Sequence, residues 1–148
     1  MNYRAASRKT LIGALCLLAA PSVAKNSPAP LPPARESVTQ SAKVTPLITK
    51  DLAGVAGKEA MMLTVEYAPG ASSSKHRHNA QTFVYVLEGS IVMAVEGGKE
   101  VTLGPGQTFY ESPDDVHSVS KNASATQPAK FLVFFVKEKG APASVPVK

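Results

Sequence analysis

Apolar and polar residues alternate along short stretches of the chain, and Gly or Pro ends nearly every stretch. Short runs rich in β-branched and aromatic residues with this punctuation predict strands joined by turns. No stretch has a sustained helical period, and residues 47–56 would hold at most one short helical turn. The pattern predicts an all-β domain, a sandwich or a barrel. The expected strands are residues 59–67, 82–87, 91–96, 100–103, 107–111, 116–120 and 131–136.

Two of these strands, residues 83–87 and 131–136, are apolar on both faces. Only one face of a strand can fill the interior of a small barrel, so the other face needs a cover. The cover is either the chain's own N-terminal strand or a second copy of the chain packed sheet on sheet. We favour the second alternative and expect a homodimer.

The first 24 residues have the composition of an export signal. Basic residues at Arg4, Arg8 and Lys9 precede an apolar run at 11–20, and the small residues at 22–24 offer a cleavage site. The run is too short to cross a bilayer. We therefore expect a bacterial signal peptide at residues 1–24, cleaved after Ala24, and a periplasmic or secreted protein that is not held in a membrane.

The remaining chain divides by composition into three parts. Residues 25–45 are rich in Pro, Ser and Ala and are expected to form a flexible linker. Residues 46–140 contain the predicted strands and form the single domain. Residues 141–148 are expected to be a flexible tail.

Charge and cysteine content limit the possible functions. The formal net charge is +5, but residues 1–24 hold three basic residues and no acidic ones, so cleavage leaves +2. This charge gives no reason to expect nucleic-acid binding. The single cysteine, Cys16, lies in the expected signal peptide, so the mature chain has no disulfide and depends on its core for stability.

The chain has only three histidines, His76, His78 and His117. Residues i and i+2 of a strand point to the same face, roughly 6.6–7 Å apart at Cα, so His76 and His78 can converge on one ion. A distant strand would bring His117 to the same place. Imidazole suits Zn, Cu, Fe and Ni, and the pattern predicts one metal site. The alternative is a metal-free interior in which the histidines serve as hydrogen-bonding groups.

The residues around these histidines resemble the two motifs of the cupins. Gly70, His76, His78 and Gly89 match the spacing of the first motif, and the segment 106–117 is similar to the second. The resemblance covers about residues 46–136. It implies a small single-domain cupin, with a double-stranded jelly-roll β-barrel and one divalent metal per chain (Fe, Mn, Zn, Cu or Ni). Cupins include dioxygenases, isomerases, lyases and plain binding proteins.

One departure from the family pattern affects the metal. Metal-binding cupins carry a glutamate where this chain has Thr82, preceded by Gln81. A centre of three neutral imidazoles would keep the ion's charge of +2, as in the three-histidine centres of the cysteine and β-diketone dioxygenases, which it resembles. Thr82 and Gln81 are further candidate ligands: we favour a place in the pocket wall for Thr82, and Gln81 would reach the metal only through a strand bulge. Glu66 and Glu111 are candidate interior acids or bases, although exposure at strand ends is favoured for both.

The favoured function is an enzyme that acts on a small oxygen-rich molecule such as an enol, diol or carboxylate. An oxygenase comes first, and a metal-assisted lyase or isomerase second. The alternative is a cupin that binds a small molecule or a metal without catalysis. The missing glutamate and the absence of a fourth histidine as a general base favour this alternative.

Overall fold

The structure, a computed structural model, describes residues 42–147. The expected signal peptide and nearly all of the expected linker lie outside these residues. Within them every regular element is a strand, which confirms the all-β class, and no helix could cross a membrane. The strands are β1 Lys43–Asp51, β2 Lys58–Tyr67, β3 His76–Arg77, β4 Gln81–Glu88, β5 Ile91–Val95, β6 Val101–Leu103, β7 Thr108–Glu111, β8 His117–Asn122, β9 Ala129–Glu138 and β10 Val145–Pro146.

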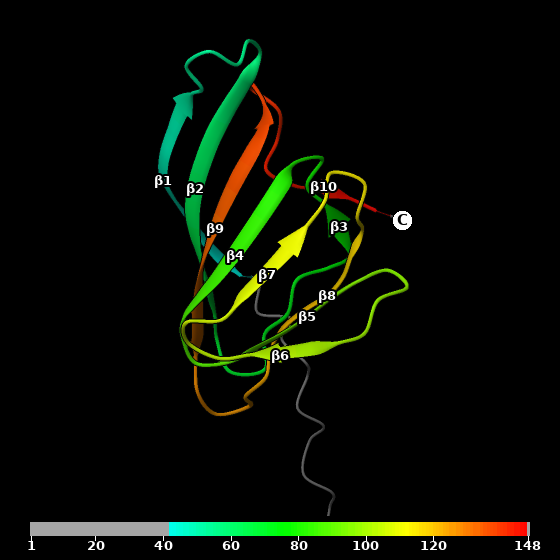
Figure 1. Ribbon diagram of the computed structural model, residues 1–148. Coiled ribbons are helices and arrows are strands. Elements are labelled where there is room, and N and C mark those ends of the chain that lie inside the picture. The colour runs from blue at the N-terminus through cyan, green and yellow to red at the C-terminus, as the bar shows by residue number, and fades with distance from the viewer. Residues whose placement is uncertain (1–41, 148) are drawn as a thin grey trace, which may run out of the picture. The chain divides into compact units, whose positions relative to one another are not determined.

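The strands form two antiparallel sheets (Figure 1). One sheet has the order β1-β2-β9-β4-β7 and the other has the order β10-β3-β8-β5-β6. The sequence left a sandwich or a barrel open, and hydrogen bonding does not close these two sheets into one ring. The arrangement is a jelly roll of two sheets, in which inward-facing residues of both build a common core.

Alternation along each strand decides what enters the core. In β4, Thr82, Val84 and Val86 are buried while Phe83 and Tyr85 between them are exposed. The same alternation along β9 turns Phe131, Val133 and Phe135 inward. The opposite sheet contributes Ile91, Met93 and Leu103 to the same apolar cluster. Burial of these side chains provides the main stabilising free energy, at roughly 25 cal/mol per Å² of apolar surface.

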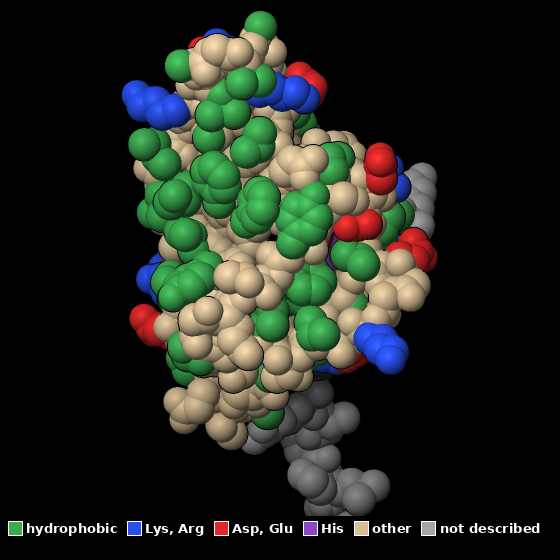
Figure 2. All heavy atoms as spheres, viewed as in Figure 1, with side chains coloured by type: hydrophobic (Ala, Val, Ile, Leu, Met, Phe, Trp, Pro, Cys, Tyr) green, Lys and Arg blue, Asp and Glu red, His purple; other side chains and the backbone are tan. Residues whose placement is uncertain are grey.

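The outer face of the β4-containing sheet carries exposed apolar side chains. Figure 2 shows hydrophobic groups gathered over this sheet. The exposed apolar side chains of its strands β4 and β7 include Phe83, Tyr85, Leu87 and Tyr110. Strand β1 does not cover them, because it extends the edge of the sheet beside β2. The alternative in which the N-terminal strand β1 covers this outer face is therefore wrong, and the homodimer remains a prediction. Its test is the molar mass by light scattering, where a monomer at micromolar concentration would contradict it.

Both ends of the domain extend further than the composition suggests. Strand β1 begins at Lys43, inside the expected linker, and ends at Asp51, within the segment 47–56 considered for a helical turn. Its register shifts between Pro46 and Ile48, as an edge strand allows around a proline. Strand β10 lies in the expected flexible tail and pairs with β3. Backbone pairing thus orders segments whose composition alone indicates flexibility.

Candidate metal centre

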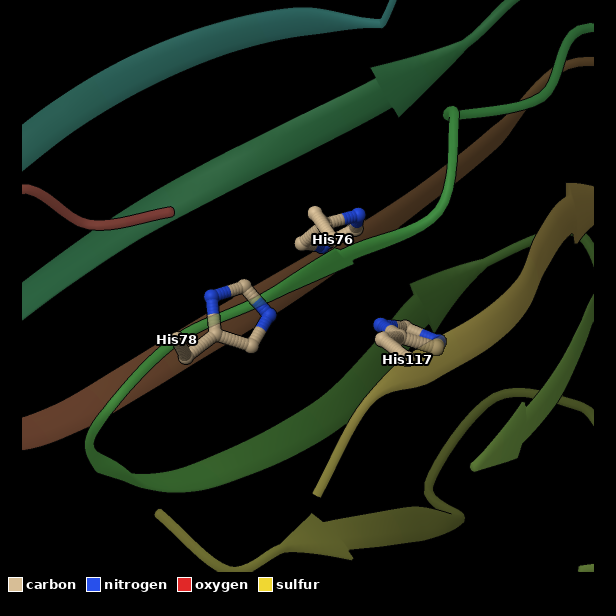
Figure 3. Close-up of side chains that lie close together, drawn as sticks. All are labelled: His76, His78 and His117. Atoms are coloured by element: carbon tan, nitrogen blue, oxygen red, sulfur yellow. The ribbon is translucent and has the colours of Figure 1, made fainter. Parts of the chain in front are cut away.

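The three histidines lie together at one end of the second sheet. His76 in β3 is the register partner of His117 in β8, and His78 follows two residues later. The ring centroid of His76 is 4.7 Å from the ring centroid of His78 and 5.1 Å from that of His117. One nitrogen from each ring lies within 4.8 Å of the other two (Figure 3). The predicted convergence of the three rings is confirmed.

Backbone carbonyls fix the orientation of two of the rings. Nδ1 of His76 lies 2.7 Å from the carbonyl oxygen of Ser74, and Nδ1 of His78 lies 2.6 Å from that of Ala143. A carbonyl oxygen only accepts, so each Nδ1 carries the proton and donates it. The neutral ring then has its lone pair on Nε2, which is the atom left for a metal.

Burial keeps His78 and His117 in the neutral form that binds metals. It lowers the pKa of His78 to about 4, and the neighbouring His76 adds to the shift. Burial also lowers the pKa of His117 to about 3, with further contributions from His76 and His78. Metal binding requires the neutral imidazole, so protons do not compete for His78 and His117 near pH 7.

The structure brings a fourth group, Glu111, to the cluster. Its side chain is 1% exposed, so the expected exposure at a strand end is wrong. Oε1 lies 3.3 Å from Nδ1 of His117, and Oε2 lies 3.8 Å from Nε2 of His78. The side chain of Glu66, by contrast, is 37% exposed, as the sequence predicted, and it pairs with Lys43 and Lys130.

The contact between Glu111 and His117 is not an ion pair. Burial raises the pKa of Glu111 to about 8, and the nearby Asp115 adds to the shift. At pH 7 burial therefore holds both Glu111 and His117 in their neutral forms. Both carboxyl oxygens of Glu111 and both ring nitrogens of His117 are buried without a hydrogen-bond partner. Among residues 42–147, one further buried side-chain atom, Nε of Arg77, also has none.

The two other candidate ligands are placed on opposite faces of β4. Gln81 is exposed, and its amide oxygen accepts a hydrogen bond from the hydroxyl of Tyr110 on the outer face. This placement corrects the alternative in which Gln81 reaches the metal. Thr82 is fully buried and faces inward, and its hydroxyl donates to the carbonyl oxygen of Ala80 at 3.3 Å.

The cluster opens onto a cavity of about 360 Å³ between the sheets. Its polar lining includes the hydroxyl of Tyr67, which lies 2.6 Å from Oγ of Ser73 and 2.7 Å from Oγ of Ser120. The segment before β10 forms part of the wall, so the expected tail contributes to the site. The apolar wall includes Leu63, Val65, Val84, Met93, Phe131, Val133 and Phe135.

These residues fit a divalent metal. The three imidazoles are a donor set that suits Zn, Cu, Fe or Ni. Backbone carbonyls orient two of the rings, and metal-bound histidines commonly have such outer partners. The unpartnered buried atoms of Glu111 and His117 lie on the side where the ligand atoms converge.

Comparison with known proteins identifies the class. Residues 63–135 match the family described as "Cupin domain". The chain therefore carries a small cupin domain, with a histidine cluster that can hold one metal ion. No curated protein is significantly similar to the chain in sequence.

Several solved structures share the fold. The polyketide cyclase RemF from Streptomyces resistomycificus is 24% identical, with a TM-score of 0.55 and 78% of each chain covered. An oxalate oxidase in complex with the substrate analogue glycolate is 24% identical, with a TM-score of 0.56, and covers 74% of this chain and 56% of its own. The DMSP lyase DddQ from Ruegeria pomeroyi is 22% identical, with a TM-score of 0.51 and 58% of this chain covered. The chain spans 42% of that lyase, and at these identities the likeness establishes the fold.

Proposed function

We propose that His76, His78 and His117 bind one divalent metal, and that the domain uses it as an oxygenase-type enzyme on a small organic molecule. The observation that carries this proposal is the convergence of three imidazoles at a cavity of about 360 Å³. A cavity of this size accepts a small ligand. A purely structural metal site would not need such a space beside it.

The lining of the cavity supports a substrate with two different ends. The histidines stand at one side, and much of the remaining wall is apolar side chains such as Leu63, Val84 and Phe131. A bound metal supplies Lewis-acid chemistry and a place for substrate oxygen atoms. The enol, diol or carboxylate end of a substrate would lie beside the histidines. The apolar wall would hold its hydrocarbon part and exclude water.

The residues of the site also weaken the case for a protein without catalysis. That alternative gained support from the missing glutamate and from the absence of a fourth histidine as a general base, and Glu111 stands within 4 Å of two of the histidines. The fold neighbours include an oxidase, a cyclase and a lyase, so the fold is compatible with several reactions. A lyase or isomerase is therefore the second outcome that an assay must distinguish.

Oxygen consumption tests the oxygenase proposal. Protein loaded anaerobically with Fe²⁺ is mixed with acetylacetone, catechol or glycolate, and dissolved oxygen and products are followed. We expect oxygen uptake above the rate of free Fe²⁺ with an enol or diol, and none with the His78→Ala variant. Product without oxygen uptake would indicate a lyase or isomerase. Micromolar binding without any product would indicate a binding protein.

We further propose that the domain acts after export. The basic, apolar and small-residue pattern of the first 24 residues supports this proposal. Expression of the full chain in a bacterium, followed by N-terminal sequencing of the periplasmic protein, is expected to give a chain that begins at Lys25. Full-length protein retained in the cytoplasm would contradict export.

A further inference from the structure

We propose that Glu111 is a ligand of the metal and supplies the carboxylate that Thr82 cannot provide. This inference rests on the proposed metal centre and assigns its fourth protein ligand. The first cupin motif places its glutamate at the position of Thr82, so a carboxylate from β7 would enter the same centre from a different strand. The centre would then carry a net charge of +1 instead of +2.

The sheet register explains how the exchange is possible. Thr82 in β4 and Glu111 in β7 are direct partners in an antiparallel pair. Directly opposite residues point to the same face, with Cβ atoms about 4.5–5.5 Å apart. Both side chains are buried on the inner face. A glutamate moved from one position to the other is displaced by one strand spacing, which its flexible side chain can span.

One of two distances already matches ligands that share one ion, and the other is somewhat longer. Oε1 of Glu111 is 3.3 Å from Nδ1 of His117, and Oε2 of Glu111 is 3.8 Å from Nε2 of His78. Ligand atoms bound at about 2.1 Å to one ion in tetrahedral or octahedral geometry are about 3.0–3.4 Å apart. The carboxylate thus needs only a small side-chain adjustment to complete the set.

The surroundings of Glu111 provide no other partner for a carboxylate. Both oxygens are buried without a hydrogen bond, although buried polar groups are nearly always paired. In residues 42–147 its charged-group contacts are with His78 and His117, and none is with a lysine or arginine. A cation between these three side chains would satisfy the carboxylate and the histidines together.

Isosteric removal of the charge tests the proposal first. Mn²⁺ and Zn²⁺ affinities are measured by titration calorimetry for the wild type, Glu111→Gln and the control Glu66→Gln, whose side chain lies outside the cavity. We expect Glu111→Gln to bind each metal more than about tenfold more weakly than the control, and to change the visible spectrum of bound Co²⁺. A difference below tenfold would overturn the inference.

A swap variant separates a ligand from a residue that only positions His117. The double variant Thr82→Glu/Glu111→Thr keeps the same two side chains in the pair and so conserves core volume. We expect it to bind Zn²⁺ at least tenfold more tightly than Glu111→Thr alone, because the carboxylate returns at the partner position. No recovery would mean that Glu111 acts through His117, where outer-partner losses are about 10–100-fold. Circular dichroism confirms folding, and a wild type that binds no metal would refute the proposed function itself.

Discussion

Replacement of His78 by alanine is expected to weaken metal binding by more than about 100-fold, above the 10–100-fold loss typical of outer-sphere partners. The reason is that Nε2 of His78 is one of three neutral nitrogen donors that converge, and its ring is already fixed by the carbonyl oxygen of Ala143. The remaining pair, His76 and His117, can hold the ion with two imidazoles only. Titration calorimetry with Zn²⁺ measures the loss.

The same variant is expected to remain folded, because the apolar cluster between the sheets stabilises the domain and His78 is not part of it. Thermal unfolding without metal should therefore be close to that of the wild type. Metal at 100 times its Kd raises the free energy of unfolding of the wild type by about 2.7 kcal/mol. The same metal concentration should not stabilise His78→Ala. Gln81→Ala, altered on the outer face, is the control and should retain the stabilisation by metal. Unchanged affinity, or an unfolded His78→Ala, would contradict this prediction.

Replacement of Gly89 by alanine is expected to destabilise the domain by about 3 kcal/mol. Gly89 joins β4 to β5 with a φ of 69°, which disfavours any residue with a Cβ. A Cβ at this position would also lie 2.3 Å from the backbone oxygen of Pro128 and 2.9 Å from Cα of Ala129. Because both neighbours are backbone atoms, the chain at the start of β9 would have to shift.

Gly97 supplies the matched control for this effect. Its φ is 79°, but a Cβ there would meet no atom within 4 Å. Gly97→Ala should therefore cost only the left-handed strain, about 1–2 kcal/mol. Urea unfolding of both variants measures the difference. Equal losses for Gly89→Ala and Gly97→Ala would show that the close approach to Pro128 does not matter.

Local pattern was sufficient to predict most strands and the histidine cluster. Gly and Pro punctuation placed β2 and β5 within a residue of their observed ends, because these turns need residues with special backbone freedom. The spacing of His76 and His78 placed both rings on one face, because side chains in strands repeat every two residues. The two motifs related these rings to His117, which a single strand pattern could not do.

Pairing between distant strands decided what the sequence left open. The sequence predicted an exposed Glu111 because this residue ends a strand. In the structure Glu111 shares a face with Phe109, which packs against the core and stacks with His117. Recognition that Phe109 points inward would have placed Glu111 inward as well, two residues later. Strands β1 and β10 were missed because their order comes from β2 and β3, not from their own composition.

The most direct test of the metal centre is a crystal structure of protein grown with Zn²⁺, with anomalous difference maps recorded at the zinc edge. We predict one strong peak per chain, about 2.0–2.2 Å from one nitrogen each of His76, His78 and His117. A zinc-loaded crystal with its peak elsewhere, or with no peak between these rings, would contradict it.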